Sequence, residues 1–132
     1  MPAVASPAEI AWGERDAVIL AVKSQDTEDA LRALSLAAPA STPVVCAQNG
    51  VANEPAALRW FDNVYGLGLQ MPCVFLEPGR VFLRSAPVSG VLDIGRYPSG
   101  IDALVEQVAA DLSASSFVCS AVQDVMRHKY RK

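Results

Sequence analysis

The sequence has 132 residues, enough for one domain of ordinary size. Its composition, 52% hydrophobic and 19% charged, is that of a folded globular chain rather than a disordered one. A net charge of −3 argues against a general nucleic-acid surface. No apolar run reaches the ~18 residues that a membrane-spanning helix needs, so we expect neither a nucleic-acid nor a membrane partner.

Cysteine and histidine are too few and too scattered to indicate a metal site. Cys46, Cys73 and Cys119 show no CxxC spacing, and His128 is the single histidine. This pattern is typical of reduced thiols and predicts no bound metal. The N-terminal residues MPAVASPAEI lack the basic region of a secretory signal. We therefore expect a cytoplasmic protein.

The first half of the sequence alternates between strand and helix patterns. Apolar runs over 17–22 and 43–48 predict strands buried on both faces, and 63–70 predicts a third strand. Helical spacing of apolar residues follows each of the first two strands, over 27–38 and 54–61. This β-α-β-α-β order predicts a parallel sheet with right-handed crossovers.

The second half departs from this alternation. Two β-rich runs flank Glu77-Pro78-Gly79-Arg80 and predict a hairpin over 74–84. A further strand is expected over 90–98, a short one over 117–122, and the start of a helix over 123–132. The most regular helical stripe predicts a helix over 101–112 and consists of Ile101, Leu104, Val105, Val108 and Leu112.

Polar residues stand where the predicted helices should begin. Asp26 or Thr27 can cap the first helix, Asn53 the second, and Ser99 the long helix that follows it. Pro55 falls in the first turn of the second helix, where proline is tolerated.

The turn Gln48-Asn49-Gly50 ends the second predicted strand. Asn-Gly between apolar runs is typical of a hairpin, but here a helix pattern follows. In open α/β sheets such a strand-to-helix turn lies at the carboxyl edge, where ligands bind. Because Lys23 follows the preceding parallel strand, we expect Lys23 and Asn49 to lie along the same crevice.

Five segments together resemble the ketopantoate reductase family, the NADPH-dependent 2-dehydropantoate 2-reductases, in their order and spacing: AVKSQDTEDAL, PVVCAQNGVANE, VYGLGLQMPCVFLEPGRV, GVLDIGRYP and DVMRHKYRK. The resemblance covers nearly the whole chain from Asp16 onward. It implies a two-domain oxidoreductase whose dinucleotide-binding and helical domains close around a 2-oxo acid. We therefore expect residues 16–120 to form part of the dinucleotide-binding domain and residues 121–132 to begin the interdomain helix. Residues 1–15 form an N-terminal segment, and one expectation is that it is disordered.

The resemblance also implies roles for individual residues. Lys23, Asn49, Gly50 and Pro72 would contact the NADP cofactor, with Pro72 beside the nicotinamide. Asn49 would also touch the substrate. Lys132 matches the family's catalytic lysine in an aromatic-x-Lys pattern, and would bind the substrate and protonate its ketone oxygen as hydride arrives.

From the residues alone, plainer interpretations stay open. Asn49-Gly50 can be a simple turn, since both residues tolerate positive φ, and Lys23 can be an ordinary solvated lysine. Lys132 belongs to a basic cluster of a kind that is usually solvated, with Arg127, Lys129 and Arg131. We expect His128 to lie on a helix surface.

The sequence also departs from the family pattern. It contains no GxGxxG turn, and the GxG of GLGLQM lies inside a predicted strand. The family's helical domain is absent as well. We therefore expect a partial Rossmann-like α/β fold, without the first strands and the Gly-rich turn but with a hairpin extension. Such a chain would be a segment of a longer reductase, inactive alone.

Two other hypotheses remain. The chain can be a non-catalytic binding or oligomerisation module that associates with itself through an exposed strand of the sheet. It can also derive from another two-domain β-hydroxyacid-type dehydrogenase that shares the same plan.

Overall fold

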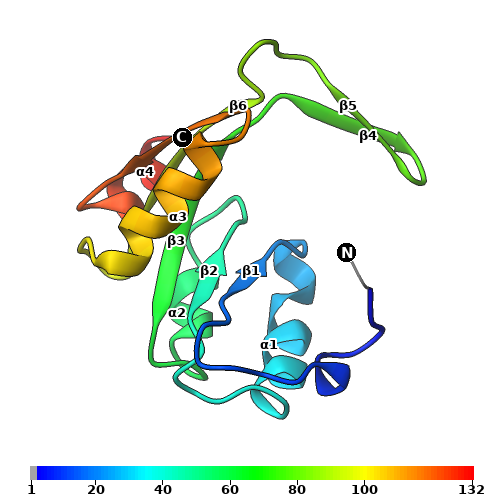
Figure 1. The fold of residues 1–132 in the computed structure, drawn as a ribbon, viewed down its shortest axis with the longest axis vertical. Helices are drawn as coiled ribbons and strands as arrows, with labels where there is room; N and C mark the ends of the chain where they lie inside the picture. The colour runs from blue at the N-terminus through cyan, green and yellow to red at the C-terminus, as the bar shows by residue number, and fades with distance from the viewer. Residues whose placement is uncertain (1–2) are drawn as a thin grey trace.

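The computed structural model describes residues 3–132 and has an α/β architecture (Figure 1). Its main sheet has the strand order β1-β2-β3-β6-β7. The strands are β1 (Val18–Leu20), β2 (Val44–Cys46), β3 (Val64–Gln70), β6 (Gly90–Arg96) and β7 (Phe117–Ala121). β1, β2 and β3 run parallel, β6 runs antiparallel to β3, and β7 is parallel to β6. The predicted partial Rossmann-like sheet is confirmed.

Helices cover both faces of this sheet (Figure 1). α1 (Thr27–Ser35) and α2 (Asn53–Ala57) lie on one face, and α3 (Ala103–Ser113) lies on the other. α4 (Val125–Arg131) packs against β3 and β6. The strand-to-helix alternation in the sequence therefore gives three layers, helix, sheet and helix.

Each face of the sheet has its own apolar core. Leu31 and Leu34 of α1 pack on the first face with Phe61, and Val105 and Ala109 of α3 pack on the second. α1 has nine residues, fewer than the ~12–15 at which isolated helices become even marginally stable. Burial of each large apolar side chain contributes about 1.5–3 kcal/mol. Packing on the sheet, rather than intrinsic propensity, therefore stabilises these short helices.

Glycines in the central strands allow α4 to approach the sheet closely. A side chain at Gly66 of β3 would lie 3.1 Å from Val125 and 3.3 Å from Glu54 Oε1. A side chain at Gly95 of β6 would lie 3.0 Å from the Cβ of Val125. The first glycine of the GxG in GLGLQM therefore makes room for a helix, a common use of glycine inside a strand.

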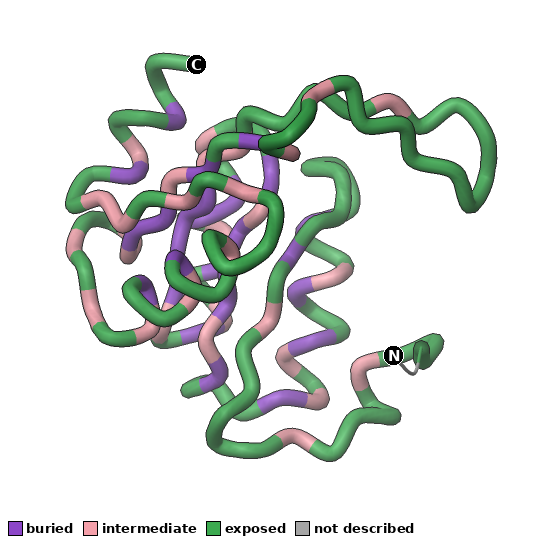
Figure 2. The backbone as a smooth tube through the Cα atoms, turned by 45° about the horizontal axis from the view of Figure 1, so that its top comes forward, coloured by how far each residue is buried: buried purple, intermediate pink, exposed green. Residues whose placement is uncertain are grey.

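The predicted hairpin is confirmed and forms a separate two-stranded sheet, β4 (Cys73–Glu77) and β5 (Arg80–Leu83). It projects away from the main sheet (Figure 1). Phe75 and Leu76 are 66% and 77% exposed. Figure 2 shows the contrast, with buried residues gathered in the central strands and an almost wholly exposed hairpin.

The expectation that the first strand is buried on both faces is wrong. In β1, Leu20 is buried but Ile19 is 57% exposed. β1 is one of the two outer strands of the sheet, and the second core contains no β1 residue. β2, which lies between two strands, is buried throughout as predicted.

The predicted cap of the long helix is also wrong. α3 begins at Ala103, and Asp102 rather than Ser99 caps it by accepting hydrogen bonds from the backbone N–H groups of Leu104 and Val105, both at 3.1 Å. Asp102 has the extended backbone and the short carboxylate that suit this position. Ile101, expected on the apolar stripe, is exposed before the helix begins.

The N-terminal segment has local structure of its own. η1, a one-turn 3-10 helix over Pro7–Glu9, begins with a capping box between Ser6 and Glu9. Trp12 packs against the first core, and its indole N–H donates to the carbonyl of Pro7 at 3.2 Å. Residues 1–2 lie outside the described part of the chain.

Candidate functional site

The carboxyl edge of the sheet is the end at which β1, β2 and β3 finish. Lys23 follows β1, and Asn49 follows β2. Both line one hollow of about 280 Å³, together with Ser24, Gln48 and Leu69. The structure thus places Lys23 and Asn49 along the same crevice, as parallel strands predict.

Buried side chains beside this hollow join the turn after β1 to the turn after β2 by hydrogen bonds. The Gln48 amide donates to the carbonyl of Val22 at 2.6 Å and to the hydroxyl of Thr27 at 2.8 Å. Thr27 in turn donates to Asn53 Oδ1 at 3.0 Å. Gln48, Thr27 and Asn53 are all buried. Because buried polar groups are costly unless they are paired, this network fixes the two turns relative to each other.

The backbone of Asn49 is held in place by the same network. Its carbonyl accepts from Asn53 Nδ2 at 3.2 Å and from the Ser24 hydroxyl at 3.4 Å. Gly50 follows with φ +87, which a side-chain-bearing residue rarely adopts. The prediction that Asn53 caps α2 is wrong: it is the first helical residue, and its side chain secures the turn instead.

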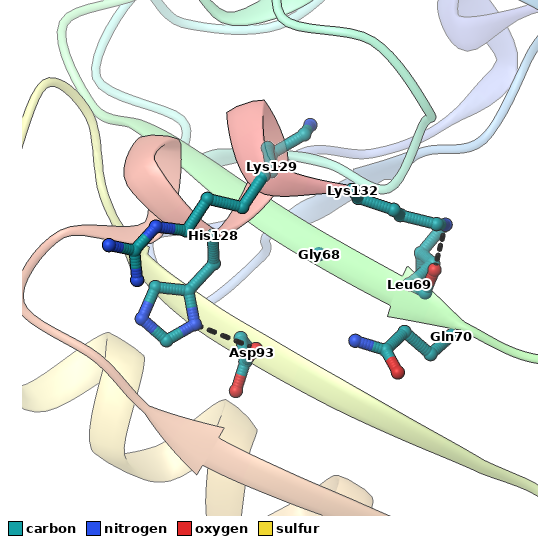
Figure 3. Close-up of a pocket in the computed structure, with 8 residues that line it drawn as sticks. Gly68, Leu69, Gln70, Asp93, His128, Lys129 and Lys132 are labelled. Atoms are coloured by element: carbon teal, nitrogen blue, oxygen red, sulfur yellow. Dashed lines mark hydrogen bonds and ion pairs between the residues drawn. The ribbon is translucent and has the colours of Figure 1, made fainter.

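Lys132 meets Asn49 at the carboxyl edge. Its ammonium group donates to Asn49 Oδ1 at 2.7 Å and to the carbonyl of Leu69 at the end of β3. Figure 3 shows the lysine reaching across the strand to that carbonyl. Residues that are 83 positions apart in the sequence are therefore in direct contact.

Lys132 also borders two other hollows. The first, of about 230 Å³, lies between α4 and the strands (Figure 3), and there His128 pairs with Asp93 at 2.9 Å. The second, of about 960 Å³, is lined by Met71 and Pro72 at the base of the hairpin. Pro72 therefore shares a hollow with Lys132 but not with Lys23 or Asn49. His128 lies on the helix surface, as expected.

The expectation of a solvated basic cluster is wrong for Lys129. Its ammonium group forms an ion pair with Glu54 of α2, and the two side chains are 3% and 0% exposed. Lys129 follows Val125 by four positions and so shares its face of α4. Because Val125 is fully buried, this spacing is the sequence signal that could have identified Lys129.

A different cluster lies at the opposite end of the sheet. Arg96 donates to Asp102 at 2.8 Å, to the Tyr65 hydroxyl at 3.2 Å and to Asn63 at 3.0 Å. Tyr65 donates to Asp102 at 2.9 Å. Burial and this bond to Asp102 raise the pKa of Tyr65 to about 12. The bond to Asp102 also raises the pKa of Arg96.

Opposing effects act on the carboxyl group of Asp102. Burial by itself would raise its pKa, but hydrogen bonds from Val105, Arg96 and Tyr65 favour the charged form, and the net pKa is lowered. The ionised Asp102 thus caps α3 and pairs with Arg96 at the same time.

The described residues offer no metal centre. Within 3–132 no group of three or more histidine, cysteine, aspartate or glutamate side chains could hold a metal ion. Burial raises the pKa of Cys46 to about 12, which keeps its thiol protonated and unreactive. No helix among these residues is both long and apolar enough to cross a bilayer.

Comparison with known proteins identifies the family. The sequence model of the ketopantoate reductase PanE/ApbA family matches residues 2–99. The chain belongs to this family, which is one of oxidoreductases. It is 29% identical over 117 residues to a 2-dehydropantoate 2-reductase of Pyrococcus horikoshii. That alignment covers 89% of this chain but 38% of the relative, so the chain spans well under half of the relative's length.

Solved structures show the same fold. The 2-dehydropantoate 2-reductase of Methylococcus capsulatus superposes with a TM-score of 0.79 at 24% identity, covering 97% of this chain and 41% of that one. D-mandelate dehydrogenase in complex with NADH superposes with a TM-score of 0.76 at 24% identity, covering 89% and 39%. At these identities the likeness shows the fold alone.

The carboxyl-edge hollow of this ketopantoate reductase family member has chemistry that suits part of a nicotinamide cofactor. Lys23 supplies a positive charge, and Asn49 offers amide donors and an acceptor. Gln48 Oε1 is buried and has no hydrogen-bond partner among the described residues. The sequence has no GxGxxG turn, however. This sequence therefore does not supply the backbone N–H donors with which that motif binds a pyrophosphate.

Proposed function

We propose that this chain contributes the cofactor-domain side of an NADP-dependent 2-oxo acid reductase similar to 2-dehydropantoate 2-reductase. That reaction converts ketopantoate to pantoate on the route to pantothenate and coenzyme A, in the cytoplasm. The observation that carries the proposal is the 2.7 Å contact between Lys132 Nζ and Asn49 Oδ1. It joins the two residues to which the family resemblance gives substrate contacts.

The proposed roles of the residues are those that the family resemblance implies. A reduced nicotinamide, when bound, would supply hydride to the ketone carbon. Lys132 donates a proton to the ketone oxygen, and Asn49 orients both the substrate and the ribose next to the nicotinamide. Lys23 provides positive charge for a phosphate. Gly50 would let the backbone turn close to the cofactor, and Pro72 would contact its nicotinamide.

Binding by this chain alone should be weak. A micromolar complex requires roughly 8 kcal/mol of binding free energy. An exposed ionic contact such as that of Lys23 supplies about 0–1 kcal/mol. Without a Gly-rich turn, side-chain contacts carry the interaction, so we expect millimolar rather than micromolar affinity and no turnover of ketopantoate.

A titration of the ¹⁵N-labelled chain with NADPH tests this proposal. At millimolar NADPH we expect backbone amide shifts confined to 22–24, to 48–50 and to 71 and 73, which flank Pro72, and a loss of these shifts in Lys23→Ala. Exposed Arg59, which follows α2 in the sequence, supplies the matched control Arg59→Ala, which should shift like the wild type. Shifts elsewhere, or none at all, would contradict the assignment of the site. Micromolar saturation with Lys132-dependent ketopantoate reduction would contradict the expected inactivity.

A second candidate is another two-domain β-hydroxyacid-type dehydrogenase, since the fold is shared with D-mandelate dehydrogenase, whose structure was solved with NADH. The two candidates differ in cofactor. NADPH should give larger shifts at Lys23 than NADH if the first holds, because Lys23 then meets an additional phosphate. Equal shifts with the two cofactors would favour the second candidate.

A third candidate is a non-catalytic module that associates with itself. β1 is one of the two outer strands of the sheet, and its Ile19 is 57% exposed. An open outer strand is a template for pairing with another chain. Sedimentation of the wild type against Ile19→Lys would test it: a concentration-dependent dimer that the substitution dissolves supports the module, and a monomer in both removes it.

A further inference from the structure

α4 is joined to one short segment of the chain by two lysines. Lys129 pairs with Glu54 of α2, and Lys132 donates to Asn49 in the preceding turn. The two lysines are three positions apart and so lie on neighbouring positions of the helix surface. The placement of Lys132 is thus tied to the placement of Lys129.

The Glu54–Lys129 ion pair is fully enclosed. The Glu54 side chain is 0% exposed, and its Oε2 has no hydrogen-bond partner among the described residues. Enclosing two charges is expensive, and a pair of apolar side chains of similar size often stabilises a fold equally well or better. Stability alone therefore does not explain why a charged pair occupies this position.

The contacts around the ion pair leave the rotation of α4 about its axis for the pair to determine. Val125 packs close to Gly66 and Gly95, which sets how near α4 lies to the sheet. Apolar packing against glycine has no direction, so it fixes the rotation of the helix poorly. The bond from Lys129 to a carboxylate is directional, and it acts one turn before Lys132.

We propose that Glu54 and Lys129 form a positioning pair, which sets the rotation of α4 so that Lys132 meets Asn49. The inference deepens the proposed function, on which it rests for the role of Lys132. Neither Glu54 nor Lys129 is a catalytic residue in this arrangement. The contact between Lys132 and Asn49 is present in the ligand-free chain, so the effect of the pair on it can be tested without cofactor or substrate.

The test follows the side-chain amide signals of Asn49 in ¹H–¹⁵N spectra of the ligand-free chain. The wild type and Lys132→Met define the two reference positions of these signals. In the double variant Glu54→Met/Lys129→Met, which leaves no unpaired buried charge, we expect the signals to move at least half-way toward the Lys132→Met position. Arg127→Met removes an exposed charge from the same helix and should leave them at the wild-type position.

A purely structural role would give a different result. Urea unfolding would then change, while the Asn49 signals of the folded double variant would stay at the wild-type position, and this outcome overturns the proposal. If the double variant does not fold, Glu54→Asp decides, because it keeps the charge but shortens the reach of the carboxylate. Intermediate signals support a positioning pair, and wild-type signals overturn it. A failed NADPH titration would bear on the proposed function and leave this result unaffected.

Discussion

The two ends of the sheet carry polar clusters of opposite character. At the end away from the carboxyl edge, Tyr65, Arg96 and Asp102 bond to one another, and Asp102 also caps α3. At the carboxyl edge, Gln48 Oε1 and Glu54 Oε2 have no partner among the described residues, although both are buried. A satisfied cluster stabilises a fold. A cluster with unused buried acceptors does not gain its full stabilisation from the described residues.

The cations at the two ends differ in the same way. Arg96 spreads its planar guanidinium over three partners and lies 5.6 Å from the centre of the Tyr65 ring, which suits a fixed structural contact. Lys132 is an exposed point charge on a flexible stem. The difference indicates that the opposite end holds α3 to the sheet, whereas the carboxyl edge holds groups that can reorient.

The largest effect should come from breaking the one fully enclosed ion pair of the carboxyl edge. Lys129→Ala leaves Glu54 as an unpaired buried charge, and such a change typically costs about 3–5 kcal/mol of unfolding free energy. Urea unfolding followed by circular dichroism measures it. Arg127→Ala, on the exposed face of the same helix, should change the free energy by less than ~0.5 kcal/mol. Equal effects for the two would show that Lys129 is solvated in solution.

The next effect tests the satisfied cluster. Asp102→Ala removes a cap that accepts from two backbone N–H groups, and it should lower the free energy of unfolding by about 1–2 kcal/mol. Asp102→Asn keeps a side chain that can cap but loses the charge, so it should lower the free energy of unfolding by less than Asp102→Ala does. If both variants unfold at the same urea concentration as the wild type, the cluster does not stabilise the fold.

The same cluster should make stability depend on pH. The pKa of Asp102 is lowered in the folded chain from an ordinary value of 3.8, so its contribution is present above that value and is lost as the pH falls through the folded pKa. The difference in urea midpoint between the wild type and Asp102→Asn should therefore shrink as the pH is lowered from about 6 to about 2. A difference that stays constant over this range would mean that the charge of Asp102 is not involved.

The sequence predicts the carboxyl edge of the sheet better than the cluster of Tyr65, Arg96 and Asp102 at its other end. Alternation of apolar strands and helices predicts the parallel sheet and its carboxyl edge, and hence the proximity of Lys23 and Asn49. It cannot show which of several polar residues caps α3. Asp102 is favoured over Ser99 by its bonds to Arg96, six positions away, and to Tyr65, 37 positions away. Tyr65 and Arg96 are brought together by the antiparallel pairing between β3 and β6.

The buried ion pair escaped prediction for a related reason. Lys129 stands among basic residues whose average behaviour is to be solvated, and its partner Glu54 is 75 positions away. What buries it is the close approach of α4 to the glycines of β3 and β6. That approach is a tertiary property, and local composition does not reveal it.

The smallest effect on stability should occur at the residues proposed to act on ligands. Lys23 and Lys132 are exposed, so Lys23→Ala and Lys132→Ala should each change the free energy of unfolding by less than ~0.5 kcal/mol. Their effect should appear with ligand instead: Lys23→Ala should abolish the NADPH-induced amide shifts at 22–24. Lys132→Ala should retain those shifts, because Lys132 is proposed to face the substrate rather than the phosphates. A loss of stability comparable to that of Lys129→Ala would place these lysines in the structural class and end the contrast between the two ends of the sheet.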